Sequence, residues 1–232
     1  MIDKVIKNIS YKQSTILKNI ITLHNNNNPF DCDITYSKGN FYGTFKDDEL
    51  GEFTISQPLY KFDVLPLSDD VKPLDPWGNI PLEDNSINSI VIDLPFIISP
   101  KNAPSVKENK DNSNIIFKRF HSYYPYNELI KSYKHWIEEA FRVLKDNGIC
   151  VFKCQNNISG GKFYCSEEIS WLFAQQCGFY VLDKFTCIAK TRLISGKIKK
   201  QQHSRNFTST FWVFRKNGKY KPIDYDINFD KS

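Results

Sequence analysis

The feature that most constrains the fold of this chain is an alternation of short apolar runs with segments of helical periodicity. Runs rich in β-branched and aromatic residues predict strands at residues 32–35, 60–64, 89–93, 148–153, 180–189 and 208–215. Apolar residues at helical spacing predict helices at residues 11–24, 126–144 and 166–177. Such alternation is typical of a mostly parallel sheet flanked by helices, so the sequence predicts an α/β fold.

The length of 232 residues is enough to bury a sizeable core without disulfides or a structural metal. We expect an N-terminal helical segment at residues 1–28 packed on the domain, a main domain at 29–218 and a polar tail at 219–232. Two connections, 96–125 and 193–207, show no periodicity, and loops of this length inside a compact domain are usually functional or disordered.

Composition excludes several classes of protein. No run reaches the ~18 apolar residues that span a bilayer, and the N-terminus lacks the apolar core of a signal peptide, so we expect a cytoplasmic protein without membrane contact. The six cysteines form no CxxC pair and no spacing typical of zinc ligands. We therefore expect small buried thiols and no metal site.

Positive charge gathers in one late segment of the chain. Residues 190–205 contain six Lys or Arg residues and no carboxylate, a pattern expected of a loop that contacts phosphates. Taken alone, the segment is equally consistent with a solvated loop. The expected nucleic-acid contacts in it are Lys197, Lys199, Lys200, His203 and Arg205.

The strongest constellation is Asp93-Leu94-Pro95-Phe96, which follows the predicted strand at residues 89–93. Residues just beyond the carboxyl end of a strand line the ligand crevice of an open α/β sheet. There the Asp93 carboxylate and the Leu94 carbonyl can accept hydrogen bonds from an amino group, while Phe96 can stack on a base flipped out of its helix. A strand-end Asp that caps a turn is the competing interpretation.

This tetrapeptide resembles the [DNS]-P-P-[YFW] signature of the amino-methyltransferases that modify adenine or cytosine in DNA. The order of elements over residues 30–216 also resembles that of class I S-adenosylmethionine-dependent methyltransferases. The segments that carry the resemblance are DCDITYSKGNFYG, FDVLPL, IPLEDNSINSIVID, IEEAFRVLKDNGICVFK, GFYVLDKF and STFWVFRK. The resemblance implies a Rossmann-like class I methyltransferase fold, with a mostly parallel seven-stranded sheet flanked by helices.

The resemblance also implies an activity and a cofactor. We expect methyl transfer from S-adenosyl-L-methionine to an exocyclic amino group of a nucleic-acid base, with adenine in DNA as the preferred target, and the catalytic residues Asp93, Leu94, Pro95 and Phe96. Asp63 would accept from the ribose hydroxyls and Asp75 from the adenine of the cofactor, although Asp84 competes for the latter role. The expected cofactor-binding residues are Asp33, Tyr36, Ser37, Lys38, Gly39, Phe41, Asp63 and Asp75.

Two departures from the family pattern keep other functions open. The Gly-rich turn retains only Gly39, and Leu94 replaces the first proline of the signature, which predicts a less rigid catalytic loop. Methylation of RNA or of a protein Gln or Asn side chain is one alternative. A non-catalytic methyltransferase-like subunit that binds nucleic acid is another. Because the chain has little room for a large separate recognition domain, we expect specificity to come from its long loops, from a homodimer or from a partner subunit.

Overall fold

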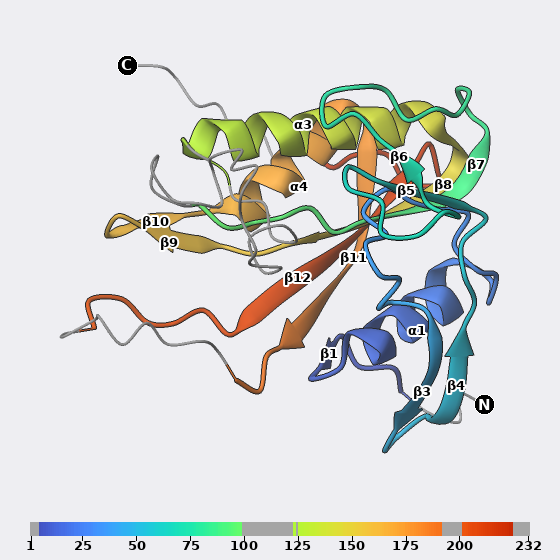
Figure 1. Ribbon diagram of the computed structural model, residues 1–232, viewed down its shortest axis with the longest axis horizontal. Coiled ribbons are helices and arrows are strands. Elements are labelled where there is room, and N and C mark those ends of the chain that lie inside the picture. The colour runs from blue at the N-terminus through green and yellow to red at the C-terminus, as the bar shows by residue number, and fades with distance from the viewer. Residues whose placement is uncertain (1–4, 99–122, 124, 192–200, 225–232) are drawn as a thin grey trace.

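The computed structural model describes residues 5–98, 123, 125–191 and 201–224. Within these residues an eight-stranded sheet forms the centre of the molecule (Figure 1). Its spatial order is β1 (Ile9–Ser10), β11 (Phe179–Ile188), β12 (Thr208–Lys216), β8 (Leu144–Cys154), β7 (Ile87–Ile92), β2 (Cys32–Asp33), β5 (Tyr60–Asp63) and β6 (Lys72–Pro73). Only β12 runs antiparallel to its neighbours, so the sheet is mostly parallel, as predicted.

The described helices lie on both faces of the sheet (Figure 1). α3 (Tyr126–Val143) and α4 (Ser166–Cys177) cover one face, and α1 (Gln13–His24) lies on the other. Successive residues of β8 point to opposite faces, so Phe152 joins the core beneath α3 while Val151 joins the core beneath α1. Two cores separated by one sheet are the expected result for a doubly covered α/β fold.

The six strands and three helices predicted from the sequence are confirmed, with ends that differ by a few residues. The α1 pattern succeeds because Ile16, Leu17 and Ile20 fall on one face and become completely buried. Each such side chain contributes about 1.5 to 3 kcal/mol to folding.

The predicted count of seven strands is wrong by one among the described residues. The two strands without a predicted range are β6 and β1, and the two residues of β1 pair in parallel with Thr186 and Cys187 and cover the outer edge of β11. Two hairpins outside the main sheet were also not predicted: β3 (Gly43–Asp47) with β4 (Gly51–Ile55), and β9 (Asn157–Ser159) with β10 (Lys162–Tyr164).

The cysteine prediction needs two corrections. Cys32, Cys150, Cys154 and Cys187 are buried free thiols, but Cys177 is only partly buried, and Cys165, directly before the first turn of α4, is exposed. Within the described ranges no helix is long and apolar enough to cross a membrane.

Candidate active site

The order of the strands reverses between β2 and β7, and this point defines the crevice of the sheet. From β2 the chain moves outward to β5 and β6, and from β7 it moves outward in the other direction to β8. In open α/β sheets the ligand crevice lies at such a switch point, outside the carboxyl ends of the strands. Asp33 ends β2 and Asp93 directly follows β7, so both predicted acidic residues lie at this crevice.

Thr35 links the two sides of the switch point. Its hydroxyl accepts a hydrogen bond from the backbone N–H of Asp93 at 2.7 Å and donates to Oδ1 of Asp33 at 3.1 Å. Asp33 is only 1% exposed, and its other oxygen accepts from the hydroxyl of Tyr42 at 2.7 Å. Asp33 therefore supports the crevice from below.

Burial also sets the protonation state of Asp33. Desolvation raises the pKa of its carboxyl to about 7, although hydrogen bonds from Tyr42 and Thr35 act in the opposite direction. The nearby negative charge of Asp93 raises this pKa further.

Asp93 forms an ion pair with Lys153. The ammonium group of Lys153 lies 2.8 Å from Oδ2 of Asp93, and the Asp93 side chain is 23% exposed. Ile92 pairs with Phe152 in the parallel register of β7 and β8, so the next residue along each strand comes to the same level. The sequence analysis assigned no role to Lys153, because its pairing with Asp93 depends on the register of two strands that lie far apart in sequence.

Three aromatic rings surround the Lys153 ammonium. It lies 5.5 Å from the ring centroid of Phe41, 5.8 Å from that of Phe96 and 5.6 Å from that of Phe211. Cations are attracted to ring faces at such distances. The predicted cofactor turn, the predicted catalytic loop and β12 thus each contribute one ring to the surroundings of a single cation.

The remaining residues of the predicted catalytic loop differ in exposure. Leu94 is 6% exposed and belongs to the core on the α3 side of the sheet, whereas Pro95 is half-buried. Phe96 and Lys153 line a cavity of about 220 Å³ together with Gln155, Phe207 and Ser209. The Leu94 side chain therefore has a packing role that a proline ring does not reproduce.

The predicted cofactor turn, residues 36–41, lies between the ends of β2 and β5. Ser37 and Gly39 have positive φ values of 51° and 67°. The ring of Tyr36 stacks on Tyr42 with centroids 5.6 Å apart, and its hydroxyl donates to Gln57. Lys38 is exposed. Phe41, at the other end of the turn, is buried and its ring faces Lys153. The two ends of the turn therefore contact different residues, Tyr36 contacting Tyr42 and Gln57 and Phe41 contacting Lys153.

Asp63 is the last residue of β5 and fastens the turn to that strand. Its carboxylate accepts hydrogen bonds from the backbone N–H groups of Ser37 at 2.7 Å and Leu65 at 2.8 Å. Burial raises the pKa of this half-buried carboxyl, and the two hydrogen bonds oppose the increase. Asp63 therefore stands at the carboxyl end of its strand, beside the turn.

The two candidates for the adenine site lie in different places. Asp75 follows β6, is exposed and accepts from the N–H of Trp77 at 2.8 Å. Asp84 pairs instead with Arg142 of α3 at 2.8 Å, just before β7 begins at the opposite edge of the sheet. Only Asp75 is on the crevice side.

The predicted nucleic-acid contacts are described in part. His203 is exposed, and its Nε2 lies 3.0 Å from the carbonyl of Gly161 in the turn between β9 and β10. Arg205 is half-buried in the same segment. Lys197, Lys199 and Lys200 lie outside the described residues.

A larger groove of about 1110 Å³ lies at the other edge of the sheet. It is lined by Asp31, Asn88 and Gly148, which stand at or near the amino ends of β2, β7 and β8. It is therefore separate from the crevice.

The chain resembles known proteins both in sequence and in fold. The DNA methylase family matches residues 87–231, more than half of the chain. No curated protein matches. Among solved structures, the chain is similar to the PvuII DNA methyltransferase (cytosine-N4-specific), with 15% identity, a TM-score of 0.37, and coverage of 58% of this chain and 44% of that one.

Two further structures illustrate the range of similarity. A proposed DNA modification methylase of Thermus thermophilus, complexed with S-adenosyl-L-methionine, is 13% identical, with a TM-score of 0.40 and coverage of 62% and 54%. A TehB-like SAM-dependent methyltransferase of Corynebacterium glutamicum is 12% identical, with a TM-score of 0.39 and coverage of 83% and 84%. The chain spans about half the length of the Thermus protein.

The matched region begins with β7, the strand that Asp93 directly follows, and runs through β8, the strand that carries Lys153. On this match, the chain belongs to the DNA methylase family.

Proposed function

We propose that this chain transfers a methyl group to an exocyclic amino nitrogen of a base in DNA, with adenine as the preferred target. S-adenosyl-L-methionine is the methyl donor of the family. The observation that carries the proposal is the partly exposed Asp93 carboxylate at the switch point: the backbone N–H of Asp93 donates to Thr35, and Lys153, which pairs with the carboxylate, lies over the Phe96 ring.

The residues of the crevice fit this cofactor. Asp63 stands at the carboxyl end of β5 and can still accept hydrogen bonds from ribose hydroxyls, because each carboxylate oxygen has more than one acceptor site. Asp75 is exposed at the end of β6 and can accept from an adenine amino group. The turn at residues 36–41 would adjoin the methionine end, with Asp33 supporting it from below. Bound there, the cofactor supplies an electrophilic methyl group on a sulfonium.

The proposed mechanism assigns the chemistry on the protein side to the catalytic loop. The Asp93 carboxylate and the Leu94 carbonyl accept hydrogen bonds from the two amino hydrogens, which directs the nitrogen lone pair away from the loop. The Phe96 ring stacks on the flipped base. Methyl transfer to this nitrogen would make it more acidic, and the Asp93 carboxylate beside it would accept the proton that it releases.

Lys153 limits the positions that the Asp93 carboxylate can take. Lys153 is only 8% exposed, and the rings of Phe41, Phe96 and Phe211 surround its ammonium group. This packing holds the ammonium in one position, from which it donates to Asp93. It binds Oδ2 of Asp93 and so orients the other oxygen. The same ion pair supports a second candidate function, a subunit that binds DNA without transferring methyl groups, since Lys153 occupies one of the two Asp93 oxygens that would accept from an amino group.

Mass spectrometry of nucleosides separates these functions. The protein is incubated with isotopically labelled S-adenosylmethionine and with DNA or RNA, and labelled N6-methyladenosine and N4-methylcytidine, in deoxy and ribo forms, are measured. We expect label in the deoxynucleoside. Asp93→Ala should lower transfer by about 10²- to 10⁴-fold with little change in cofactor affinity, because the lost interaction acts mainly in the transition state.

Asp69→Ala, at an exposed position, is the matched control and should retain full activity. Label in RNA alone would contradict the DNA assignment. No transfer by the wild type, with cofactor binding intact by calorimetry, would favour the non-catalytic subunit.

A further inference from the structure

The β9–β10 hairpin leaves the sheet directly beside the candidate catalytic residues. β8 carries Lys153 and ends at Cys154, and β9 begins at Asn157. The hairpin forms its own two-stranded sheet and projects away from the central one (Figure 1). Its tip is Gly160-Gly161, with φ values of 57° and 74°, a conformation suited to a tight two-residue turn.

Residues 201–207 are fastened to this hairpin at both ends. Near the base, the Asn206 amide donates to the carbonyl of Asn156 at 2.9 Å. Near the tip, Nε2 of His203 lies 3.0 Å from the carbonyl of Gly161 and must carry a proton, because a carbonyl only accepts. We call residues 157–164 and 201–207 together the projecting ridge.

One face of the hairpin packs on the protein and the other is open. The ring of Tyr164 packs at a tilt of 32° against that of Tyr126 at the start of α3, with ring centroids 4.3 Å apart. On the opposite face Ile158 and Phe163 are cross-strand partners, 37% and 53% exposed. Phe207, in the facing segment, is 38% exposed. Neighbouring exposed apolar side chains of this size are a feature of interaction sites.

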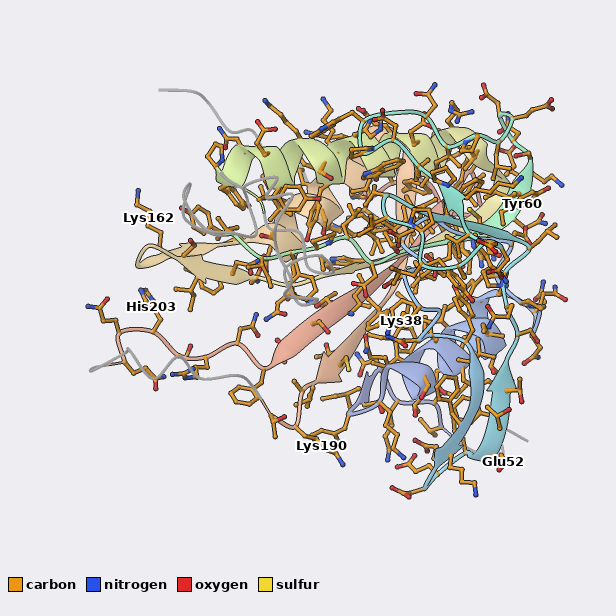
Figure 2. All side chains as sticks on the ribbon, in the orientation of Figure 1. Lys38, Glu52, Tyr60, Lys162, Lys190 and His203 are labelled. Atoms are coloured by element: carbon orange, nitrogen blue, oxygen red, sulfur yellow. The ribbon has the colours of Figure 1, made fainter. Side chains whose placement is uncertain are left out.

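The charge of the projecting ridge is positive. Residues 157–164 and 201–207 contain the cations Lys162 and Arg205 and no carboxylate. Figure 2 shows Lys162 and His203 at the same end of the molecule, one on the hairpin and one on the segment that faces it. Cations around an apolar pair complement the phosphates and the stacked bases of a nucleic acid.

We propose that the projecting ridge contacts duplex DNA beside the target base, with Ile158 and Phe163 packing against bases left unstacked by flipping and Lys162 contacting a phosphate. This inference rests on the proposed function and identifies the surface that would hold its substrate. A two-stranded ribbon fits the major groove, and apolar side chains are known to wedge into opened base steps. The position next to Asp93 and Lys153 favours DNA over a protein partner.

The test uses the full chain and fluorescence anisotropy with a labelled duplex and its single strand. Ile158→Ala combined with Phe163→Ala should weaken duplex binding by about tenfold, the order of magnitude of one base-stacking interaction. The weakening on the single strand should be smaller, since no base step has to be opened. Lys162→Ala should reduce the slope of log affinity against log salt by about 0.9, the value for one phosphate contact.

Matched controls are Leu59→Ala and Lys46→Ala, which remove exposed side chains far from the projecting ridge and should change neither quantity. Lys162 is exposed, so its variant tests the ridge even if the double variant folds poorly. If both variants bind the duplex with the affinity and the salt slope of the wild type, the inference is wrong. That result would leave the proposed methyl transfer unaffected. Conversely, the wild type could methylate neither DNA nor RNA while the variants still bind duplex DNA more weakly than it does. The proposed function would then be wrong, and the inference about the projecting ridge would stand.

Discussion

Gly39 and Gly51 share a left-handed backbone, with φ values of 67° and 72°, but differ in their surroundings. A Cβ at Gly39 would lie 2.6 Å from Cζ of Tyr36, whereas a Cβ at Gly51 would meet nothing within 4 Å. Gly51→Ala should therefore lower the free energy of unfolding by about 1 kcal/mol, the cost of the backbone conformation alone.

Gly39→Ala must in addition displace the Tyr36 ring, and we expect a loss of about 3 kcal/mol together with weaker cofactor binding. Urea denaturation and calorimetry measure the two effects. Equal losses in the two variants would show that the Tyr36 contact has no energetic weight.

Asp33 predicts a pH dependence of stability. Its pKa is about 7 in the folded chain and near the ordinary value of 3.8 when unfolded. Between these values the folded state binds more protons, so the free energy of unfolding falls as pH rises, by up to about 4 kcal/mol in total. Asp33→Asn should remove most of this decline in urea denaturation at pH 5 and pH 8. If the free energy of unfolding of the Asp33→Asn variant falls with pH as steeply as that of the wild type, a group other than Asp33 causes the pH dependence.

At the scale of elements, Lys216 joins the end of α3 to the start of β8. Its buried ammonium donates to the carbonyls of Phe141 and Leu144 at 2.6 and 2.8 Å and to Asn85 at 2.7 Å. Lys216→Met would leave these acceptors without a donor and should lower the free energy of unfolding by about 2 to 3 kcal/mol. The exposed Lys219→Met is the control and should change it by less than about 0.5 kcal/mol. Thermal denaturation that gives similar values for both would contradict the role of Lys216.

The elements with long periodic patterns could be predicted from the sequence, whereas of the short strands only β2 and β5 were predicted. α3 has 18 residues with one apolar face, so its pattern is unambiguous. β1 and β6 have two residues each, too few for any periodicity, and depend on the strand beside them. The β9–β10 hairpin carried a Gly-Gly turn signal, but its three-residue strands were too short to stand out.

The candidate site was accessible from sequence only in part. The position of Asp93 after an apolar strand was sufficient to place it at the crevice. Its partner Lys153 depends on the register between two strands that lie far apart in sequence, and the burial of Leu94 depends on helices packed above it. Such tertiary neighbours cannot be obtained from local patterns.

For the whole molecule, the basic segment predicts salt-dependent DNA binding. Replacing Lys197, Lys199 and Lys200 together should reduce the slope of log affinity against log salt by about 0.9 for each phosphate that these lysines neutralise, up to roughly 2.7. Filter binding at several salt concentrations measures this slope. An unchanged slope would restrict DNA binding to other residues, such as those of the projecting ridge.

The pairing of β1 with β11 has a consequence for synthesis on the ribosome. Ile9 and Ser10 pair with Thr186 and Cys187, and the helix that follows β1 packs into a core completed by Phe211 and Val213. At roughly 5 to 20 residues per second, translation leaves the apolar face of α1 uncovered for on the order of ten seconds or more. The nascent chain would therefore need shielding by a chaperone, and premature termination before β12 would release an aggregation-prone fragment instead of a smaller folded unit.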